Sequence, residues 1–476
     1  MNFYPPFKVF LLATLAMSAS LAGCQSREAR AKKAFDSYQA ASATGDLVAT
    51  RNALLQLVAQ DDSNAQYWTE LGKVQLAQAD YGGAYNAFVR AHELDRANPE
   101  ILAVLTQITL RSGNLDLAEK HARELELVAS ADPAVPLTFG YVALRRDDIA
   151  AATDHATKLL AATPYDSSAK VLKSRILLRS GKPDDAIALL REQIRLQPSD
   201  VLSLRALMKI FERRDQWSDA SAIARSLIKW QAEDQGLRTQ LIEYELLAGD
   251  VVSALRNTTQ ALPSADARQI EALLAPWSMT GRQDLVTGRV FIEGKAATGV
   301  RRLALARFLV FQGKPDDALM LAREMATLPA TPASLAANAL FGAALAQSPQ
   351  DVLGAQRLDM VLNIDSGNFD ALRSRAAWRS KKGSHKQAIE DGRKLVSIDR
   401  RSAQARLLLA RIHFAAGQSE EARRVLWTAF HDIPADRTIY SALKTAIAEA
   451  EGLRVVQRLD QEFTDQRDAA MTRSFG

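Results

Sequence analysis

Residues 65–98 read AQYWTELGKVQLAQADYGGAYNAFVRAHELDRAN, and this stretch decides the fold of the chain. In its first half, Trp68 and Leu71 lie on one helical face, and Gly72 leaves room for a close neighbour. In its second half, small, large and small residues follow at spacings of four and three, at Ala84, Phe88 and Ala91. Such spacings place them in one stripe along a helix. The stretch therefore predicts two helices that pack closely against each other.

The alanine at position 84 of this stretch recurs along the chain every 34 residues. The series is Ala84, Ala118, Ala152, Ala186, Ala220 and Ala254. Glycines follow this interval at the turn between the helices, at Gly113, Gly181 and Gly249. A period of about 34 residues is typical of a helix–turn–helix unit whose copies stack and bury one continuous core. The sequence therefore predicts an all-α solenoid.

The quoted residues resemble the tetratricopeptide repeat (TPR), which places Trp, Leu and Gly on helix A and Ala, Phe and Ala on helix B. This resemblance implies a right-handed superhelix of about twelve repeats. In this family the A helices line a concave groove that holds extended or helical peptides. The resemblance therefore implies a protein that binds other proteins and is not catalytic. We therefore expect a protein–protein interaction scaffold rather than an enzyme.

The interval breaks in the middle of the chain. Residues 263–300 hold more prolines and glycines than any comparable stretch, and Ala318 follows Ala254 slightly sooner than two further periods would place it. The segment is interpreted either as a decayed repeat or, functionally, as a bend or a docking site. An enzyme or metal site hidden in this segment is a third interpretation.

Residues 1–23 have the pattern of a secretory signal peptide, with early positive charge and an apolar run over 9–19. The following Leu21-Ala22-Gly23-Cys24 resembles the lipobox of bacterial lipoprotein precursors. The resemblance implies a lipid on Cys24, the single cysteine of the chain. Because Gln25 rather than aspartate follows, it also implies a lipid-anchored protein at the outer membrane with its body in the periplasm. A plain signal peptide with an incidental cysteine is the alternative.

These features predict six segments along the chain. They are a signal peptide (1–23), a lipidated N-terminus with a degenerate first repeat (24–64), a regular array (65–266), a shortened repeat (267–298), a second array (299–436), and capping helices with a tail (437–476).

Composition and motifs give no sign of catalysis. The net charge of +5 is modest for 476 residues. Nucleic-acid-binding proteins normally carry a concentrated basic face, so the charge does not indicate this class of protein. The hexapeptide GKPDDA occurs at 181–186 and 313–318, where it suits a turn followed by a helix start rather than a phosphate site. His121 and His155 stand one repeat period apart and could approach each other as two metal ligands. We nevertheless expect no metal, no nucleic acid and no cofactor besides the covalent lipid.

Basic residues recur at the repeat interval near the ends of the expected A helices, at Arg111, Arg145, Arg179 and Arg213. One turn earlier, the same helices carry Gln107, Tyr141, Arg175 and Lys209. One interpretation is a groove track that binds an acidic segment or an anionic polymer through charge-assisted contacts. The other is that each arginine complements the dipole at its helix end.

A second basic region spans residues 373–424. Its candidate patch consists of Arg373, Arg375, Arg379, Lys381, Lys382 and Arg411. It is interpreted either as a solvated helical face or as a surface for an acidic protein, lipid headgroups or an anionic polysaccharide.

Lipoproteins of this size and repeat type resemble helpers of export through the bacterial envelope. We therefore expect a scaffold for exopolysaccharide or surface-protein export. The alternative is an assembly factor for a pilus, secretin or outer-membrane protein machine. The expected partners are other envelope proteins, and the oligomeric state stays open.

Overall fold

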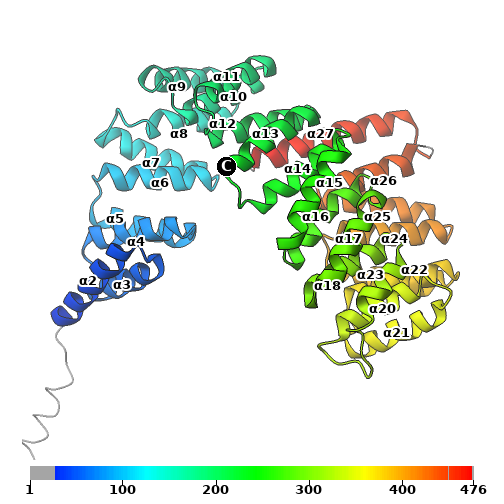
Figure 1. Ribbon diagram of the computed structural model, residues 1–476. Helices are drawn as coiled ribbons and strands as arrows, with labels where there is room; N and C mark the ends of the chain where they lie inside the picture. The colour runs from blue at the N-terminus through cyan, green and yellow to red at the C-terminus, as the bar shows by residue number, and fades with distance from the viewer. Residues whose placement is uncertain (1–26, 449, 474–476) are drawn as a thin grey trace, which may run out of the picture. The chain divides into compact units, whose positions relative to one another are not determined.

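The computed structural model describes residues 27–448 and 450–473, which form α-helices joined by short connections (Figure 1). Cys24 and the expected signal peptide lie outside the described residues. The described residues contain 26 α-helices, which form 13 consecutive pairs rather than about twelve. Even-numbered helices are the A helices of these pairs and odd-numbered helices are the B helices. The predicted all-α solenoid is confirmed.

The chain divides into two compact units, of which the first ends at Ala186 and the second begins at Ile187, within α11 (Pro183–Leu196). The other helices of the first unit are α2 (Arg27–Thr44), α3 (Leu47–Gln60), α4 (Ala65–Ala77), α5 (Tyr81–Leu94), α6 (Pro99–Arg111), α7 (Leu115–Val128), α8 (Ala134–Arg145), α9 (Ile149–Ala162) and α10 (Ser167–Arg179). This division differs from the arrays expected from the repeat pattern, which stay a prediction.

The second unit continues the same alternation of helices. Its members are α12 (Val201–Arg213), α13 (Trp217–Trp230), α14 (Gln235–Leu247), α15 (Val251–Ala261), the 3₁₀ turn η1 (Leu262–Ser264), α16 (Ala267–Met279), α17 (Asp284–Ala296), α18 (Gly299–Phe311), α19 (Pro315–Ala322), α20 (Leu335–Leu345), α21 (Asp351–Ile364), α22 (Phe369–Lys381), α23 (His385–Ile398), α24 (Ala403–Ala415), α25 (Ser419–Asp432), α26 (Arg437–Ala448) and α27 (Leu453–Arg473).

Short polar residues start many of these helices. The side chain of Asn64 accepts a hydrogen bond from the backbone N–H of Gln66 at the start of α4. Asp80 caps α5 in the same way through the N–H of Gly83. Such caps satisfy N–H groups that have no partner within the helix. They fix where the helix begins in each of these pairs.

The alanine ladder lies in the buried interior of the helix pairs. All six alanines from Ala84 to Ala254 are 0% exposed. A methyl group added to Gly72 would lie 2.6 Å from the ring of Phe88, which is also fully buried. Because protein interiors are close-packed, larger residues at these positions would push the two helices apart.

The turn between the A and B helices also repeats. One residue in each of six successive pairs has a positive φ, between 54° and 82°: Ala79, Gly113, Asp147, Gly181, Asp215 and Gly249. Glycine adopts this left-handed conformation freely, whereas other residues are strained there. The chain therefore imposes one turn geometry on three residues that do not favour it.

The segment at 263–300 keeps the helix-pair architecture. Helices α16 and α18 each begin slightly less than one repeat period after the preceding A helix, and α20 begins slightly more than one period after α18. The side chain of Arg301 donates hydrogen bonds to the carbonyl oxygens of Leu262, Pro263 and Ala265 at 3.2, 2.8 and 2.8 Å. These bonds satisfy backbone acceptors that the irregular connection leaves without helical partners.

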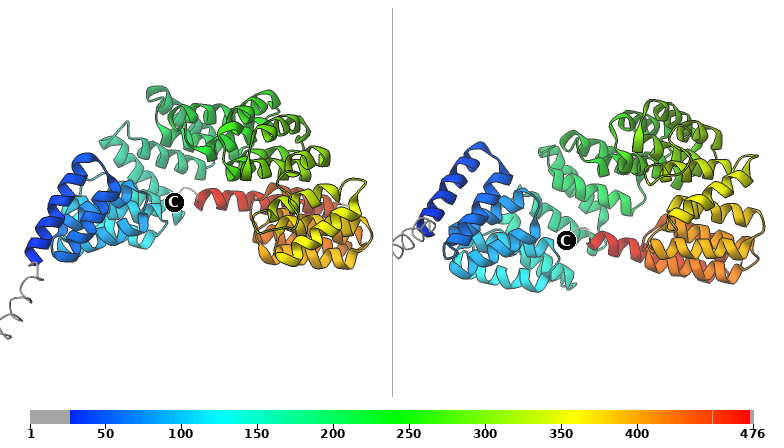
Figure 2. Two further views of the ribbon diagram at one scale, coloured as in Figure 1. Left: turned by 60° about the horizontal axis from the view of Figure 1, so that its bottom comes forward. Right: turned by 90° about the horizontal axis from the view of Figure 1, so that it is seen from below.

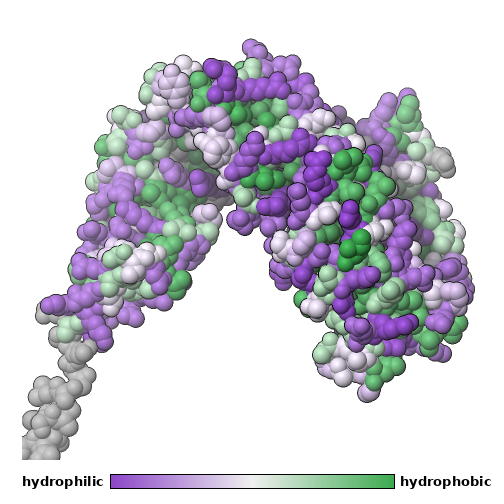
Figure 3. All heavy atoms as spheres, in the orientation of Figure 1, coloured by the Kyte–Doolittle hydropathy of each residue, from purple (hydrophilic) through white to green (hydrophobic). Residues whose placement is uncertain are grey.

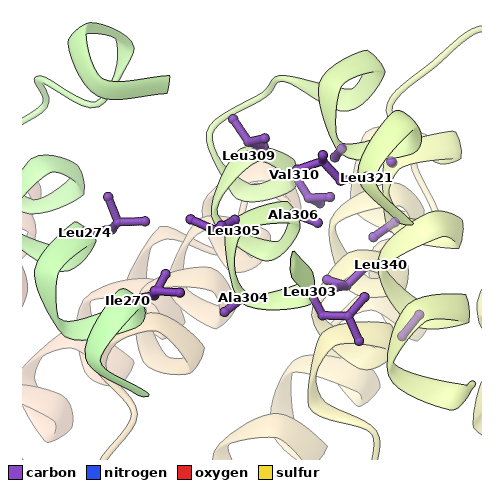
Figure 4. Close-up of a cluster of buried hydrophobic side chains, with 14 of the residues drawn as sticks. Ile270, Leu274, Leu303, Ala304, Leu305, Ala306, Leu309, Val310, Leu321 and Leu340 are labelled. Carbon is purple, nitrogen blue, oxygen red and sulfur yellow. The ribbon is translucent and has the colours of Figure 1, made fainter. Parts of the chain in front are cut away.

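A continuous core joins the pairs around this segment. Figure 4 shows side chains of α18 between those of α16, such as Ile270 and Leu274, and those of α20, such as Leu340. Leu305 and Leu309 of α18 are 0% exposed. Burial of this kind contributes roughly 1.5–3 kcal/mol for each large apolar side chain. The shortened spacing therefore does not interrupt the core.

The end of the second unit returns to its beginning. Asp215, in the turn between α12 and α13, accepts hydrogen bonds from Arg437 at 3.2 Å and Arg467 at 3.1 Å. Arg467 also donates to the carbonyl oxygen of Glu212 at 2.8 Å, and the Arg437 guanidinium lies 4.6 Å from the centre of the Trp217 ring. Figures 1 and 2 show α27 beside the helices that open this unit. These contacts join residues that are far apart in the chain.

Hydrophilic residues cover much of the face shown in Figure 3, with small hydrophobic patches between them. Within the described part of the chain, no helix combines the length and the apolar character needed to cross a membrane.

The strained turn gives a first prediction. Ala79→Gly should raise the free energy of unfolding by up to about 1 kcal/mol, because glycine relieves the cost of the left-handed conformation. Gly113→Ala is the matched control and should lower it by about the same amount, since nothing lies within 4 Å of the added methyl group. Urea denaturation of both variants measures the change, and a loss of stability in Ala79→Gly would contradict the argument.

The return of α27 gives a second prediction. Asp215→Asn should speed amide hydrogen exchange in residues 453–467 by about two- to fivefold, because exposed ion pairs contribute up to about 1 kcal/mol. Asp147→Asn is the control, since Asp147 has the same turn conformation but pairs with Arg179 of the next helix pair. Equal exchange in both variants would show that these ion pairs do not hold α27.

Candidate functional site

Neighbouring A helices, such as α6 and α8 or α14 and α16, contact each other within their unit, and the surface that they present together is called here the inner face. Each A helix contributes side chains from its outward-pointing positions to this face, at intervals of three and four residues. Side chains at equivalent positions of neighbouring pairs therefore come close together. The basic residues predicted from the sequence divide on this face into those with partners and those without.

In the first unit, Tyr141 and Arg175 form a cation–π contact between α8 and α10. The Arg175 guanidinium lies 5.0 Å from the centre of the Tyr141 ring. Burial raises the pKa of the Tyr141 hydroxyl and lowers the pKa of Arg175. Both residues therefore belong to the packing between neighbouring pairs as well as to the inner face.

The arginine ladder is not uniform. Arg179 forms an ion pair with Asp147 of the preceding turn. Arg111 and Arg145 are exposed, and neither forms an ion pair or hydrogen bond through its side chain with the residues that the structure describes. Gln107 lies on α6 one turn before Arg111. Two of the three first-unit arginines therefore keep their full hydrogen-bonding capacity for another molecule.

The remaining ladder residues belong to the second unit. Lys209 pairs with Glu212 at 2.7 Å, and the Tyr244 hydroxyl donates to the same carboxylate at 3.0 Å. Arg213 is exposed at the end of α12. Burial and the charge of Glu212 raise the pKa of Glu243 on the next A helix. This part of the inner face is therefore of mixed charge rather than a continuous basic track.

The second basic patch contains an internal ion-pair network. Asp391 is 5% exposed and accepts two hydrogen bonds from Arg375, at 3.0 and 2.7 Å, and one from Arg379 at 2.8 Å. Asp359 on α21 binds Arg375 from the other side at 2.6 Å. This network ties α21, α22 and α23 together, so Arg375 and Arg379 stabilise the fold.

The other members of this patch differ from one another. Lys382 pairs with Asp351 at 2.6 Å. Lys381 and Arg411 are exposed and form no ion pair with a described residue. Arg373 is half-buried and stacks on the Phe311 ring, with the guanidinium 3.6 Å from the ring centre. The patch predicted from composition is therefore not one surface, because half of its cations are neutralised internally.

Sequence reasoning missed Arg307 and Phe311 on α18, which contact the acidic and basic residues of α22. Arg307 donates to Asp370 at 2.8 Å, across the alanine-rich helix α20. The repeat interval does not align Arg373 with Arg411, because Arg411 lies one helical turn further along its own helix. A search that allowed shifts of one turn between A helices would have brought the two arginines together.

The two histidines considered as a metal pair have different neighbours. His121 lies beside His92, with ring centres 6.2 Å apart, and His155 lies beside Phe139, with ring centres 5.6 Å apart. Glu124 Oε2 is 3.1 Å from His92 Nε2 and 3.8 Å from His121 Nδ1. Within the described ranges, no group of three or more His, Cys, Asp or Glu residues could hold a metal ion. His121 on α7 therefore contacts His92 on α5, whereas His155 on α9 contacts Phe139 on α8.

The network around Asp391 predicts a large loss on truncation. Asp391→Ala should lower the free energy of unfolding by about 3 kcal/mol, because it leaves two arginines without their buried counter-charge. Asp359→Ala is the matched control and should cost less than about 1 kcal/mol, since the Asp359 side chain is 51% exposed. Denaturant titration of both variants compares them, and equal losses would contradict a special role for the buried carboxylate.

The buried histidine predicts a pH dependence. Burial lowers the pKa of His121 in the folded chain, so the unfolded chain binds more protons below about pH 6.5. The stability of the first unit should therefore fall as the pH drops below this value, and His121→Leu should reduce the slope. His92, Lys120 and Glu124 are the charged or titratable groups that act on it. Thermal unfolding of both proteins between about pH 5 and 8 measures the slopes, and identical slopes would contradict the assignment.

Comparison with known proteins bears on this architecture. Models of the tetratricopeptide repeat match residues 299–324 and 381–447, and the model of the Psidin N-terminal TPR repeats region matches residues 141–244. No curated protein matches the chain in sequence.

Several solved structures are similar to the chain. The P58(IPK) TPR domain is 15% identical, with 82% of this chain and 99% of that chain covered and a TM-score of 0.25. YrrB, described as a TPR protein with an unusual peptide-binding site, is 17% identical over 36% of this chain and 87% of its own, with a TM-score of 0.31. A tetratricopeptide repeat protein from Parabacteroides merdae is 12% identical over 70% and 99%, with a TM-score of 0.29. Because these TM-scores are low, the assignment depends on the family models and the repeat geometry. The chain is an α-helical solenoid that carries tetratricopeptide repeats.

Proposed function

We propose that this protein is a non-catalytic scaffold that binds other proteins on the inner face of its A helices. The observation that carries the proposal is the presence there of exposed cations, such as Arg111 and Arg145, without partners among the described residues. An arginine side chain offers five N–H donors to a carboxylate or another planar acceptor. Tetratricopeptide solenoids bind protein partners, and this surface has the chemistry to do so.

The scaffold is proposed to act in the bacterial cell envelope. The support is the sequence Leu21-Ala22-Gly23-Cys24, which implies a lipid on Cys24, and Gln25, which implies delivery to the outer membrane. Several acyl chains on one residue would hold the protein stably at the membrane, with the solenoid in the periplasm. Within the envelope, export of an exopolysaccharide or a surface protein is the assembly that we favour.

Chemical cross-linking in cells tests the scaffold proposal. The wild-type chain should capture specific envelope proteins, and Arg145→Glu should reduce that capture several-fold. Arg96→Glu, which makes the same charge change in the connection between two helix pairs, should not. Polymerase or export components among the captured proteins would support the favoured assembly, and pilus, secretin or outer-membrane assembly components would replace it. Capture of abundant porins alone by all variants would overturn the scaffold itself.

The membrane anchor gives its own prediction. Cys24→Ser should move the protein from the membrane fraction, because the thiol that would carry the lipid is absent. Gln25→Asp keeps the cysteine and should shift the protein from the outer-membrane to the inner-membrane fraction. Density-gradient fractionation separates these outcomes, and unchanged membrane association of Cys24→Ser would overturn the anchor.

A further inference from the structure

The outward face of the B helix α17 carries apolar side chains where other B helices carry charged ones. Leu285 and Ile292 are two helical turns apart, on the side of α17 opposite the residues that it buries. Leu285 is 54% exposed and Ile292 is 60% exposed. Counted from the helix start, the same two positions hold exposed charged residues on α7 (Asp116 and Arg123), α11 (Asp184 and Arg191) and α23 (Lys386 and Arg393). The apolar pair is therefore not a general property of the repeat.

Neighbouring positions extend the apolar character of this face. Gly288 lies between Leu285 and Ile292, and nothing lies within 4 Å of a methyl group added to it. The three residues are called here the apolar stripe. The neighbouring B helix α15 contacts α17 and carries Val252, which is 70% exposed. Single apolar residues are ordinary at a protein surface, whereas a group of them on adjoining helices indicates an interaction surface.

The charges of α17 are neutralised unequally. Its two carboxylates, Asp284 and Glu293, form ion pairs at 3.1 and 3.0 Å with cations of α18 and of the turn that follows it. Its two cations, Arg289 and Lys295, are exposed on either side of the apolar stripe, and neither forms an ion pair with a described residue. The Lys295 ammonium lies 5.5 Å from the centre of the Phe291 ring. The stripe is therefore flanked by two positive charges that no internal carboxylate balances.

Charges on the adjoining B helices define how far this surface extends. On α15, Arg256 lies one turn after Val252, and its charge acts on Asp250, which also has another cationic partner. On the other side, α19 begins with two acidic residues, Asp316 and Asp317. The surface that is both apolar and positive therefore comprises the outward faces of α15 and α17 and ends before α19.

An apolar stripe with cations on both sides has the chemistry of a membrane-surface helix. In such helices the apolar side chains enter the boundary between headgroups and acyl chains, while lysine and arginine reach the phosphates. Because lipids move freely in the plane of the bilayer, anionic headgroups can supply counter-charges to both Arg289 and Lys295. A protein partner would need an apolar groove with carboxylates fixed at both of its edges.

We propose that the outward face of α15 and α17 binds the surface of a bilayer that contains anionic phospholipids. Leu285 and Ile292 enter between the headgroups, and Arg289 and Lys295 bind the phosphates. The inference goes beyond the proposed function, because it needs neither a lipid on Cys24 nor a partner on the inner face. It also gives the irregular segment at 263–300, which contains α17, a role as a docking site.

Cosedimentation with phospholipid vesicles tests this surface. Because the apolar run over 9–19 would bind vesicles by itself, the protein used is the chain of residues 24–476 with Cys24→Ser, which can carry no lipid. It should bind vesicles of phosphatidylcholine mixed with an equal amount of phosphatidylglycerol at least about tenfold more tightly than phosphatidylcholine alone, and less tightly as salt rises. Leu285→Gln with Ile292→Gln should lower the affinity at least about tenfold, and Arg289→Gln with Lys295→Gln should do the same.

The B helix α7 supplies matched controls. Leu127→Gln with Val128→Gln removes two exposed apolar side chains, and Lys120→Gln with Arg123→Gln removes two exposed cations. Neither pair of substitutions should change vesicle binding. Circular dichroism and thermal unfolding establish that each variant is folded.

A fluorescent label tests whether the apolar stripe enters the bilayer. Since Cys24 is the single cysteine of the chain, Gly288→Cys in the Cys24→Ser background gives one labelling site. The emission of a bimane label at this position should shift to shorter wavelength on vesicles that contain phosphatidylglycerol. The same label on Leu127→Cys should not shift.

Several outcomes would overturn the inference. They are absence of binding to phosphatidylglycerol vesicles, losses of equal size in the α7 controls, and an unshifted emission at position 288. Self-association that Leu285→Gln with Ile292→Gln abolishes, without vesicle binding, would assign the surface to a second copy of the chain. A cross-linked protein lost in the same variant, again without vesicle binding, would assign it to a protein partner. The scaffold proposal fails separately, if the wild-type chain captures no specific partner.

Discussion

The close approach of helix A to helix B at the ladder alanines is the contact on which the rest of the structure depends. Six alanines at this position are 0% exposed, and Gly72 faces Phe88 without room for a methyl group. Because each pair is built on the same contact, neighbouring A helices lie side by side and form the inner face. The left-handed turn at Ala79 and its equivalents is a consequence of this repeated geometry.

The partners of a basic residue, rather than its presence in the sequence, decide what it can do on this face. Arg375 and Arg379 are neutralised by the buried carboxylate of Asp391, so they hold three helices together. Arg145 and Arg411 have no such partner among the described residues. A solenoid exposes the same helix positions in pair after pair, and internal carboxylates determine which of its cations stay available.

The two compact units use an equivalent turn residue in different ways. In the first unit, Asp147 pairs with Arg179 of the next helix pair, which strengthens a local contact. In the second unit, Asp215 has the same backbone conformation but pairs with Arg437 and Arg467 near the end of the chain. An aspartate at this turn position thus supports stacking between neighbouring pairs in one unit. In the other unit, it supports a contact between the start and the end of the unit, called here closure. Closure adds a contact that simple repeat stacking lacks.

The sequence by itself determined the fold class, the repeat length and the buried ladder, because the periodic placement of small and large residues is a local pattern that stacking preserves. It also indicated the basic residues of the inner face, although not their roles. Tertiary structure alone decided that His121 meets His92, that Arg307 reaches Asp370 across α20, and that Arg467 returns to Asp215. These contacts join residues at different heights on neighbouring helices or at opposite ends of a unit. The first two contacts depend on the offsets between nearby helices, and the return of Arg467 depends on curvature that accumulates over many pairs. No single repeat encodes either.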